Sequence, residues 1–471
     1  MYKLSQYNPL DHHYHFIAIG GIGMSGLANI LIERGATVSG SDVAHNYVTK
    51  SLEKAGAKIH IGHAAENIPP SAIVVYSTAI TGDNPEMAYA KKKGYPLLHR
   101  AELLAQLMES HAALLVAGTH GKTTVSALLA HVLVAVGTSP SYAVGGIIQS
   151  LHKNGEAGDG PYFVAEACES DGSFLLYPGY GGIITNIDND HLDYWKEMPA
   201  LIEGYRRFIG NMRSKEHLYL CTDDPILKNL TVEASQETKT YWKTYGFDAS
   251  ADVRILEFRQ YGWKIVFSLQ IHDQYYTDIE VPLVGRHNAQ NAAAVFALVL
   301  SLGVSEESLR KAFLSFKGIG RRLEKKGEMH GIEIYDDYGH HPTEIAATLE
   351  AVREGTQGRR LVVVFQPHRY TRTRDCLAEF GPSFRAADIV YLTDIYSAGE
   401  TPIPGIDTSA LMVQMQKANL STLLYSARGA LAQQLIKELK KDDMLITLGA
   451  GDVTKLGGEL LALWKDQENP L

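Results

Sequence analysis

Cysteines and long apolar runs are both scarce in this sequence. Only three cysteines occur among the 471 residues, at Cys168, Cys221 and Cys376. Such wide spacing favours neither a disulfide framework nor a cysteine-based metal site, and it is typical of a reducing compartment. No apolar run reaches the ~18 residues that a membrane-spanning helix needs, and residues 1–11 lack the apolar core of a signal peptide. We therefore expect a cytoplasmic protein without membrane insertion.

An excess of positive charge is also missing. The chain has 44 Lys and Arg residues against 53 Asp and Glu residues, which gives a formal net charge of −9. This balance disfavours a general nucleic-acid-binding role. Hydrophobic residues make up 45% of the chain, as in ordinary globular proteins. The length predicts two to four domains, each able to bury a sizeable core.

A strand, a glycine-bracketed turn and a helical pattern follow one another in the middle of the chain. The apolar run Leu114–Ala117 leads into Gly118-Thr119-His120-Gly121-Lys122-Thr123-Thr124. The two glycines allow backbone N–H groups to face phosphate oxygens. Lys122 supplies a charge for the outer phosphates, and the Thr123 hydroxyl can ligate Mg²⁺. Val116 stands where the full phosphate-loop pattern has a glycine, so the turn is a shortened variant of a nucleotide-binding loop.

A second glycine-rich turn lies near the N-terminus, after a predicted buried strand at Tyr14–Ile19. A G-x-G-x-x-G pattern follows at Gly21, Gly23 and Gly26. A helical pattern at 27–34 and a strand ending at Asp42 complete a βαβ unit, in which Asp42 lies where an acid can bind a ribose. The pattern indicates a pyrophosphate on a helix N-terminus, as in a dinucleotide or a UDP-sugar. The alternative is a tight βα turn without a ligand.

Ser77, at the end of a predicted strand at 72–77, lies at the same edge of this predicted sheet. Arg100, before an amphipathic stretch at 103–108, can meet an anionic ligand or lie at a solvated helix N-terminus.

Two central strands end in acids. The strand at 162–166 runs into Glu166, Glu169 and Asp171, and the strand at 183–187 is followed by Asp188, Asp190 and His191. A single acid at a strand end is more often a helix cap than a ligand. Together, and in the same segment as the phosphate loop, these oxygens and the imidazole indicate Mg²⁺ binding. Between the phosphate loop and the first of these strands we expect a strand that ends in a loop at Gly145 and Gly146, and a polar surface loop at 154–161.

The last third of the chain repeats the pattern of strands with polar ends. Gly318 and Gly320 beside two arginines indicate a hinge, and strands at 332–335, 361–365 and 444–448 each end in polar residues. The neighbours His340 and His341 do not converge on a metal, because adjacent side chains diverge on helices and strands. One is expected to be functional while the other packs or caps, and Thr343 or the run that contains it can cap the next helix. Asn288, before an apolar helix at 292–302, can recognise a base or cap that helix.

Taken together, these motifs resemble the Mur ligases, ATP-dependent amide-forming enzymes of peptidoglycan synthesis. The resemblance extends from His15 to Asp452. It implies an α/β fold with three domains: a Rossmann-like UDP-sugar-binding domain at 1–110, a central P-loop ATPase-type domain at 111–321, and a Rossmann-like amino-acid-binding domain at 322–471. The assembly implied is a monomer or a homodimer.

The resemblance also implies roles for individual residues. UDP-N-acetylmuramate is expected at Gly21, Gly23, Met24, Gly26, Asp42 and Ser77. ATP is expected at Gly118, Thr119, His120, Gly121, Lys122, Thr123, Thr124, Asn288, Asn291, Arg321 and Asp337. Two Mg²⁺ ions are expected at Thr123, Glu166 and His191. L-alanine is expected at Tyr338, His340, His368, Arg369 and Arg372. Catalysis is expected to involve Lys122, His191, His340, Arg369 and Arg372.

Within the family, residues 15–24, 336–344 and 365–373 favour the member that adds L-alanine to UDP-N-acetylmuramate. The competing member, which attaches a tripeptide to the same nucleotide sugar during recycling, usually lacks the stretch Gln366-Pro367-His368-Arg369-Tyr370. Cys168 departs from the family pattern, which has an acid at this position. Two other classes of function are a nucleotide-dependent switch without catalysis and an NAD-dependent oxidoreductase. The first needs only one polar cluster, and the second leaves the phosphate loop unexplained.

Overall fold

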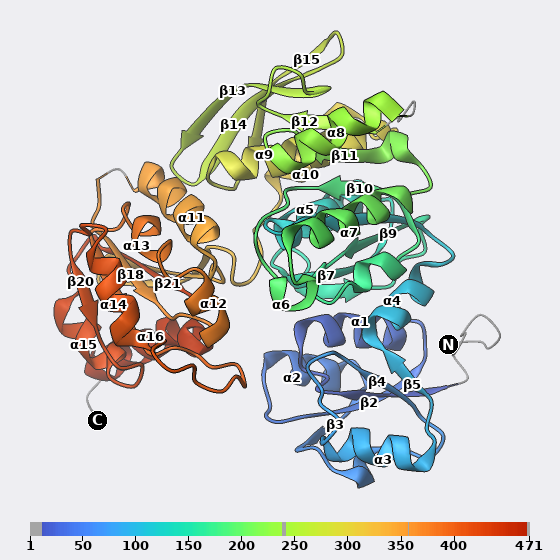
Figure 1. The fold of residues 1–471 in the computed structure, drawn as a ribbon, viewed down its shortest axis with the longest axis horizontal. Helices are drawn as coiled ribbons and strands as arrows, with labels where there is room; N and C mark the ends of the chain where they lie inside the picture. Colours follow the sequence, from blue (N-terminus) through green and yellow to red (C-terminus); the bar gives the residue numbers. More distant parts are fainter. Residues whose placement is uncertain (1–11, 238–241, 357, 469–471) are drawn as a thin grey trace. The chain divides into compact units, whose positions relative to one another are not determined.

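The computed structural model describes residues 12–237, 242–356 and 358–468, so the expectation for residues 1–11 lies outside it. Three separate sheets with flanking helices make up the chain (Figure 1). The predicted α/β class is confirmed. The chain divides into two compact units, and the first contains the residues up to Glu257 with Phe267–Ile279 and Gln290–Lys317. Within the described ranges, no helix combines the length and the apolar character needed to cross a membrane.

The N-terminal sheet is parallel and has the strand order β3-β2-β1-β4-β5. Its strands are β1 (His13–Ile17), β2 (Thr37–Asp42), β3 (Lys58–Ile61), β4 (Ile73–Tyr76) and β5 (Leu97–His99). Its helices are α1 (Ile22–Glu33), α2 (Tyr47–Lys54), α3 (Pro85–Lys93) and α4 (Arg100–Met108). Strand β1 ends before the predicted Ile19 because Ala18 has a φ of 60°. The order reverses between β1 and β4, and ligands of such sheets bind at this switch point.

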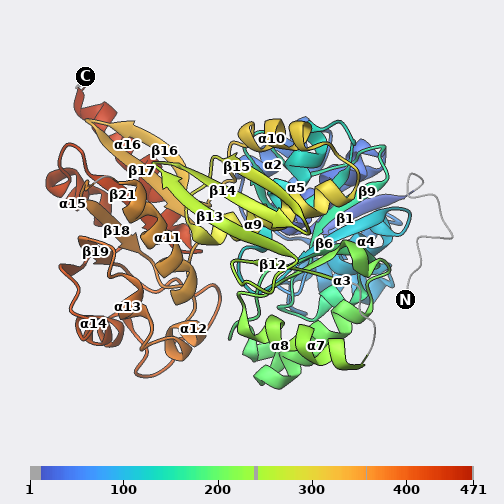
Figure 2. The same cartoon turned by 90° about the horizontal axis from the view of Figure 1, so that it is seen from above.

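The central sheet has ten strands in the order β15-β14-β13-β12-β11-β10-β6-β9-β7-β8, and Figure 2 shows β13, β14 and β15 side by side. The strands are β6 (Ala112–Ala117), β7 (Ser141–Ile148), β8 (Lys153–Glu156), β9 (Tyr162–Glu166), β10 (Gly179–Ile184), β11 (Leu218–Cys221), β12 (Lys243–Gly246), β13 (Val253–Tyr261), β14 (Lys264–Ile271) and β15 (Gln274–Val281). The helices are α5 (Lys122–Ala135), α6 (Leu192–Trp195), α7 (Met198–Gly210), α8 (Pro225–Glu237), α9 (Arg286–Ser301) and α10 (Glu306–Leu314).

Three expectations for this region are wrong. Strand β7 continues through Gly145 and Gly146 instead of ending there in a loop, and the predicted surface loop at 154–161 begins within β8. Helix α9 begins at Arg286, earlier than the apolar run suggested. Asn288 therefore lies inside its first turn, where the side-chain amide donates to Val284 O (2.8 Å) instead of capping the helix.

The C-terminal sheet has the order β16-β17-β21-β18-β19-β20 and is parallel except for β16. Its strands are β16 (Glu324–Met329), β17 (Ile332–Asp337), β18 (Leu361–Phe365), β19 (Ile389–Leu392), β20 (Leu423–Tyr425) and β21 (Met444–Leu448). Its helices are α11 (Pro342–Gly355), α12 (Tyr370–Asp375), α13 (Phe380–Ser383), α14 (Thr408–Gln416), α15 (Leu431–Glu438) and α16 (Leu456–Glu468). One core packs α11, α13 and α14 on the sheet, and another packs α15 and α16. His341 caps α11 by accepting a hydrogen bond from the Thr343 N–H, which confirms that one histidine of the pair caps. Glu344, in the run that contains Thr343, completes this capping box by accepting from the His341 N–H, whereas Thr343 itself is not the cap.

A buried acid, Glu86, lies in the N-terminal domain and is not among the predicted site residues. The carboxylate of Glu86 accepts hydrogen bonds from the Ser41 hydroxyl (2.5 Å) and the Asn67 amide (2.7 Å). The imidazoles of His15 and His63 lie 3.5 and 3.7 Å from it. Burial alone raises the pKa of Glu86, but the hydrogen bonds from His15, Ser41 and Asn67 outweigh burial and hold this pKa below its ordinary value.

Substitution Glu86→Gln is therefore expected to lower the free energy of unfolding by about 2 kcal/mol at pH 7. A carboxylate with a lowered folded pKa stabilises the fold above its unfolded pKa, and this contribution disappears as the pH falls through the folded value. The difference between variant and wild type should shrink below pH 4.5. Urea unfolding at pH 7 and pH 4 measures it, with the exposed Glu53→Gln as control. A difference that grows with acidity would contradict this account of Glu86.

Candidate active site

The phosphate loop between β6 and α5 has the geometry that its glycines predict. Gly118 and Gly121 have φ values of 126° and 87°, where a side chain is strained. A Cβ at Gly118 would overlap the Thr185 hydroxyl, and one at Gly121 would lie 3.3 Å from Asn291 Oδ1. Neither glycine can therefore be replaced without distorting the loop.

Residues after β10 hold this loop in place. The Asn186 side chain accepts from the His120 N–H (2.8 Å), and the Thr185 hydroxyl donates to His120 O (2.6 Å). The His120 ring contacts the Asp188 carboxylate at 3.0 Å. The Thr119 hydroxyl accepts from the Asp188 N–H (2.9 Å). The residues that follow β10 thus hold the phosphate loop in place.

Lys122, the first residue of α5, is buried and bends back onto its own loop. Its ammonium group donates to Gly118 O (2.5 Å), Thr119 O (3.0 Å) and the fully buried Glu169 carboxylate (2.9 Å). Burial by itself lowers the pKa of Lys122, but the Glu169 carboxylate outweighs this and raises the pKa above its ordinary value. Lys122 is therefore a permanent positive charge at the base of the loop. The sequence indicated Glu169 only as one acid of three and did not indicate this pairing.

Thr123 and Glu166, two of the predicted metal ligands, meet beside the loop. The Thr123 hydroxyl donates to Glu166 Oε2 (3.0 Å), and the Gly145 N–H donates to the same oxygen (3.0 Å). A Cβ at Gly145 would overlap that carboxylate. A hydroxyl and a carboxylate are hard oxygen donors that fit Mg²⁺. The sequence does not indicate that Gly145 belongs to this site, because a glycine at the end of a strand equally predicts a loop.

His191, the third predicted metal ligand, follows β10 in a left-handed conformation with a φ of 58°. Its N–H donates to Asp190 Oδ1 (2.8 Å), and its ring lies 3.7 Å from Asp190 Oδ2. The structure thus orients His191 through Asp190. Cys168 donates from its thiol to the Ser170 hydroxyl (3.2 Å), and burial raises the pKa of this thiol. Where the resemblance stated above implies an acid, this chain therefore has a neutral thiol.

The N-terminal glycine turn lies at the switch point between β1 and β4, and Ser77 follows β4 at the same edge. Gly21 is the N-cap of α1, and a Cβ at Gly23 would lie 3.6 Å from Arg100 Nη1. Arg100 itself lies 3.9 Å from Asp171 of the central domain. The edge thus carries a helix N-terminus and one guanidinium, which suit an anionic ligand.

Other predicted residues of this turn have contacts within the protein. The Asp42 carboxylate accepts from the Gly20 N–H (2.8 Å) and the Val43 N–H (2.8 Å), so it holds the turn against β2. Met24 is buried in α1. A Cβ at Gly26 would lie 3.2 Å from Asn154 O, so Gly26 packs against β8.

A cluster of rings and guanidinium groups lies at the strand ends of the second unit. The ring centroids of Tyr338 and His340 are 5.3 Å apart, and those of His340 and His368 are 5.9 Å apart. The His368 ring stacks on Tyr396 at 5.8 Å. Arg372 Nη1 lies 3.4 Å from His368 Nδ1. The structure thus brings together four of the predicted amino-acid-site residues and adds Tyr396, which no sequence pattern indicated.

Charge and backbone conformation distinguish two members of this cluster. Burial, together with the positive charges of neighbours such as Arg372, lowers the pKa of His368 to about 3, so its ring is neutral near pH 7. Arg369 has a φ of 72°, and its N–H donates to Tyr396 O (2.8 Å). A non-glycine residue in this region is strained, a feature that often accompanies binding sites. A neutral acceptor beside two arginines suits a zwitterionic amino acid.

The remaining predicted ATP residues lie in different units. Asn291 belongs to the first unit, beside Gly121, whereas Asn288, Arg321 and Asp337 belong to the second. Arg321 lies over the Tyr338 ring at 4.9 Å and donates to Gly449 O (2.7 Å). The Asp337 carboxylate accepts from the N–H groups of Gly339 and Leu323 (2.7 Å each), and burial raises its pKa. Thr124 is half-buried in the first turn of α5.

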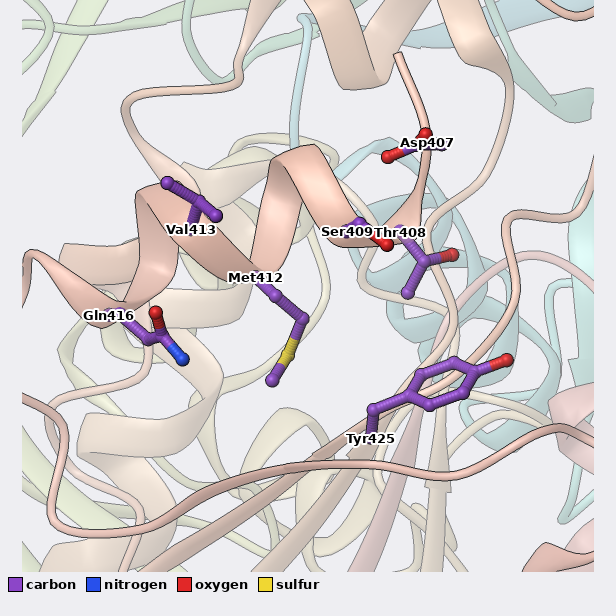
Figure 3. A pocket seen from close by; sticks show the side chains of 7 residues that line it. All are labelled: Asp407, Thr408, Ser409, Met412, Val413, Gln416 and Tyr425. Atoms are coloured by element: carbon purple, nitrogen blue, oxygen red, sulfur yellow. The ribbon is translucent and has the colours of Figure 1, made fainter. Parts of the chain in front are cut away.

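A separate surface cavity of about 440 Å³ lies beside α14 and β20 (Figure 3). It is lined by Asp407, Thr408, Ser409, Met412, Val413, Gln416 and Tyr425. These described lining residues include none of the predicted site residues, so this cavity is not the candidate active site.

Comparison with known proteins agrees with this geometry. Three family models match the chain: "Mur ligase family, catalytic domain" at residues 13–112, "Mur ligase middle domain" at 116–299, and "Mur ligase, glutamate ligase domain" at 321–451. A UDP-N-acetylmuramate–L-alanine ligase of Protochlamydia amoebophila is 46% identical over 96% of this chain and 98% of its own length. One of Anaeromyxobacter dehalogenans is 42% identical over 98% of this chain and 99% of its own length.

Solved structures show the same fold. A UDP-N-acetylmuramate–alanine ligase from Thermotoga maritima superposes with a TM-score of 0.82 at 26% identity, covering 97% of this chain and 99% of that one. A murein peptide ligase from Psychrobacter arcticus superposes with a TM-score of 0.71 at 22% identity, covering 96% and 98%. The matched domains, the full-length relatives and the three polar strand ends lead to one conclusion: this chain belongs to the Mur ligase family.

Proposed function

We propose that this protein is an ATP-dependent ligase that joins L-alanine to the lactyl carboxylate of UDP-N-acetylmuramate in peptidoglycan precursor synthesis. The observation that carries the proposal is the 46% identity, over nearly the whole chain, to a relative with that name. Residues 1–110 would bind the nucleotide sugar, 111–321 ATP, and 322–471 the amino acid. The requirement for ATP and three free cysteines support a cytoplasmic location.

A carboxylate is a poor electrophile, so amide formation requires its activation. In the proposed reaction the lactyl carboxylate attacks the γ-phosphorus of ATP, the bond to the bridging oxygen breaks, and an acyl phosphate and ADP form. Lys122 would exchange its contacts with Gly118, Thr119 and Glu169 for phosphate oxygens and stabilise the charge that develops there. The Thr123 hydroxyl and Glu166 would hold one Mg²⁺ ion, and His191 would help to hold a second. Bound Mg²⁺ would neutralise phosphate charge during the transfer.

The amino group of L-alanine then attacks the acyl carbon, and phosphate leaves from the tetrahedral intermediate. Arg369 and Arg372 are proposed to bind the alanine carboxylate, because guanidinium pairs with it through two hydrogen bonds. The neutral His368 ring would then orient the amine without repelling it. Two roles are proposed for the step in which the amine loses its proton: His340 would receive the proton, or orientation of a free amine alone would suffice.

Substitution Arg372→Lys tests the carboxylate contact. We expect the alanine KM to rise about 10-fold, because an ammonium group loses the paired hydrogen bonds. The KM values for ATP and for the nucleotide sugar should stay within about twofold of the wild-type values, because the substitution removes a contact to the amino acid only. Steady-state kinetics with each substrate varied in turn measures the three constants. The exposed Arg374→Lys on the same helix is the matched control, and an unchanged alanine KM in Arg372→Lys would remove Arg372 from the proposed site.

Phosphate release with UDP-N-acetylmuramate and ATP tests the function itself. L-alanine, glycine, L-serine and the recycled tripeptide are each added in turn. Release that depends on L-alanine is the expected result. Release with the tripeptide alone would identify a recycling ligase, and nucleotide binding without any release would identify a switch protein.

A further inference from the structure

Asn154, which the sequence placed in a surface loop, belongs to β8 and is buried against α1 with 1% of its surface exposed. Its amide nitrogen donates to Ile22 O (2.6 Å) and to the Ser25 hydroxyl (3.0 Å). The Ser25 hydroxyl donates in turn to Ile22 O (3.1 Å). Both acceptors lie in the first turn of α1, immediately after the N-cap Gly21. One buried side chain of the central domain therefore fixes the turn that presents N–H groups to the nucleotide sugar.

The backbones of β8 and α1 touch without side chains between them. A Cβ at Gly155 would overlap Gly26 O, and a Cβ at Gly26 would lie 3.2 Å from Asn154 O. At the other end of α1, the Glu33 carboxylate accepts from the Ala157 N–H (2.7 Å) and from Lys153 Nζ (2.7 Å). Because it is held at both ends and packed closely between them, α1 has to follow any displacement of β8.

The same hairpin reaches the metal-binding residues through β7. Gly145 of β7 donates its N–H to the Glu166 carboxylate, which also accepts from Thr123. The register between β7 and β8 shifts between the pairs Ala143–Gly155 and Ile148–Lys153. This irregular stretch contains Gly145 and lies opposite Asn154. A bulge leaves extra residues out of the ladder and bends the strand locally.

We propose that the β7–β8 hairpin couples the phosphate loop to the nucleotide-sugar turn, with Asn154 as the positioning residue. The proposal rests on the proposed function, because that function assigns ATP to the phosphate loop and the nucleotide sugar to the turn at Gly21. When Thr123 and Glu166 turn toward Mg²⁺, Glu166 gives up its contact with the Thr123 hydroxyl and changes the one with Gly145. The hairpin carries this change to Asn154 and so to Ile22 and Ser25. The coupling is reciprocal, because each ligand must affect the other's affinity by the same factor.

Isothermal titration calorimetry tests the proposal through a ratio of dissociation constants. The Kd of UDP-N-acetylmuramate is measured with and without Mg²⁺ and β,γ-methylene-ATP, for wild type and Asn154→Ala. We expect the analogue to tighten wild-type binding about 5-fold or more, and this ratio to fall below about twofold in the variant. A merely structural role would change both Kd values and leave their ratio intact. A wild-type ratio of one, or a variant that keeps the wild-type ratio, would overturn the proposal.

Two controls keep the result interpretable. Asp159→Asn changes an exposed side chain just after β8 that makes none of these contacts, and it should retain the wild-type ratio. Hydrogen exchange of the peptide that covers residues 21–27 in wild type should slow when Mg²⁺ and the analogue are added without the sugar; unchanged exchange would also overturn the proposal, even if Asn154→Ala fails to fold. Alanine-dependent phosphate release on the same preparations tests the proposed function separately, because an active enzyme that lacks the coupling contradicts only the hairpin proposal.

Discussion

Replacing Lys122 with Ala is expected to lower kcat by about 10³-fold and to leave the Kd of UDP-N-acetylmuramate within about twofold of wild type, because Lys122 is proposed to act mainly in the transition state. The side chain lies at the base of the phosphate loop, on carbonyls that phosphate oxygens can replace as partners. Its charge is secured by Glu169, which outweighs burial and raises the Lys122 pKa. Removal of this charge therefore affects phosphoryl transfer more than ground-state binding of the sugar.

The stability of this variant needs a control of its own. Glu169 is fully buried, and removing its partner leaves an unpaired carboxylate, a change that costs about 3 kcal/mol or more. The double variant Lys122→Ala with Glu169→Gln removes both charges and should recover much of this stability while staying equally inactive. Single-turnover phosphate release and calorimetry separate the two effects. Equal losses in kcat and in sugar affinity would contradict the assigned role of Lys122.

Replacing Glu166 with Gln is expected to lower kcat by about 10²-fold or more, because an electrostatic contact to the transferring group weakens. The Mg²⁺ concentration for half-maximal rate should rise about 10-fold, since ligand charge sets affinity for hard cations. The shape of the side chain is retained, so the space left by Gly145 is still filled. Rate measurements across a Mg²⁺ titration give both values.

The matched control for this substitution is the exposed Glu109→Gln, which changes net charge equally and should leave the Mg²⁺ dependence unaltered. A Glu166→Gln enzyme with a wild-type Mg²⁺ dependence would show that the carboxylate only supports the loop through Thr123 and Gly145.

The parts of the site that the sequence predicted are those set by neighbouring residues. Gly118, Gly121 and Lys122 follow a strand and open a helix within a few positions, and the positive φ of both glycines is a local requirement. The βα turn at Gly21 is predictable for the same reason. In these two strand–turn–helix segments, the conformation of each glycine and the order of the neighbouring residues determine the local structure.

The contacts that the sequence did not predict join distant residues. Lys122 and Glu169 are 47 positions apart, and Asn154 and Ile22 are 132 apart. No local pattern encodes such pairs. Gly145 shows the difficulty in one residue, because a glycine serves both in a turn and where another group approaches closely. Asn154, which suggested the start of a surface loop, instead donates its side-chain amide to the first turn of α1.

Tyr396 illustrates a further limit. It lies in the irregular segment after β19, and its ring is placed by the stacking contact with His368 and by the hydrogen bond from the Arg369 N–H to its carbonyl. The sequence predicted His368, Arg369 and Arg372 from their resemblance to a family motif, whereas nothing in the residues around Tyr396 marks it. Positions of this kind become visible only when the strand ends are brought together.

The central claim is that ATP activates the lactyl carboxylate as an acyl phosphate. It is tested most directly with UDP-N-acetylmuramate carrying ¹⁸O in that carboxylate, incubated with ATP, Mg²⁺ and L-alanine. Attack by the carboxylate on the γ-phosphorus places one carboxylate oxygen in the acyl phosphate. When the amine attacks the acyl carbon, phosphate leaves and takes this oxygen with it. Mass spectrometry of the released phosphate should therefore find one ¹⁸O atom per molecule of labelled product formed. Unlabelled phosphate, released with normal amide formation, would contradict the account.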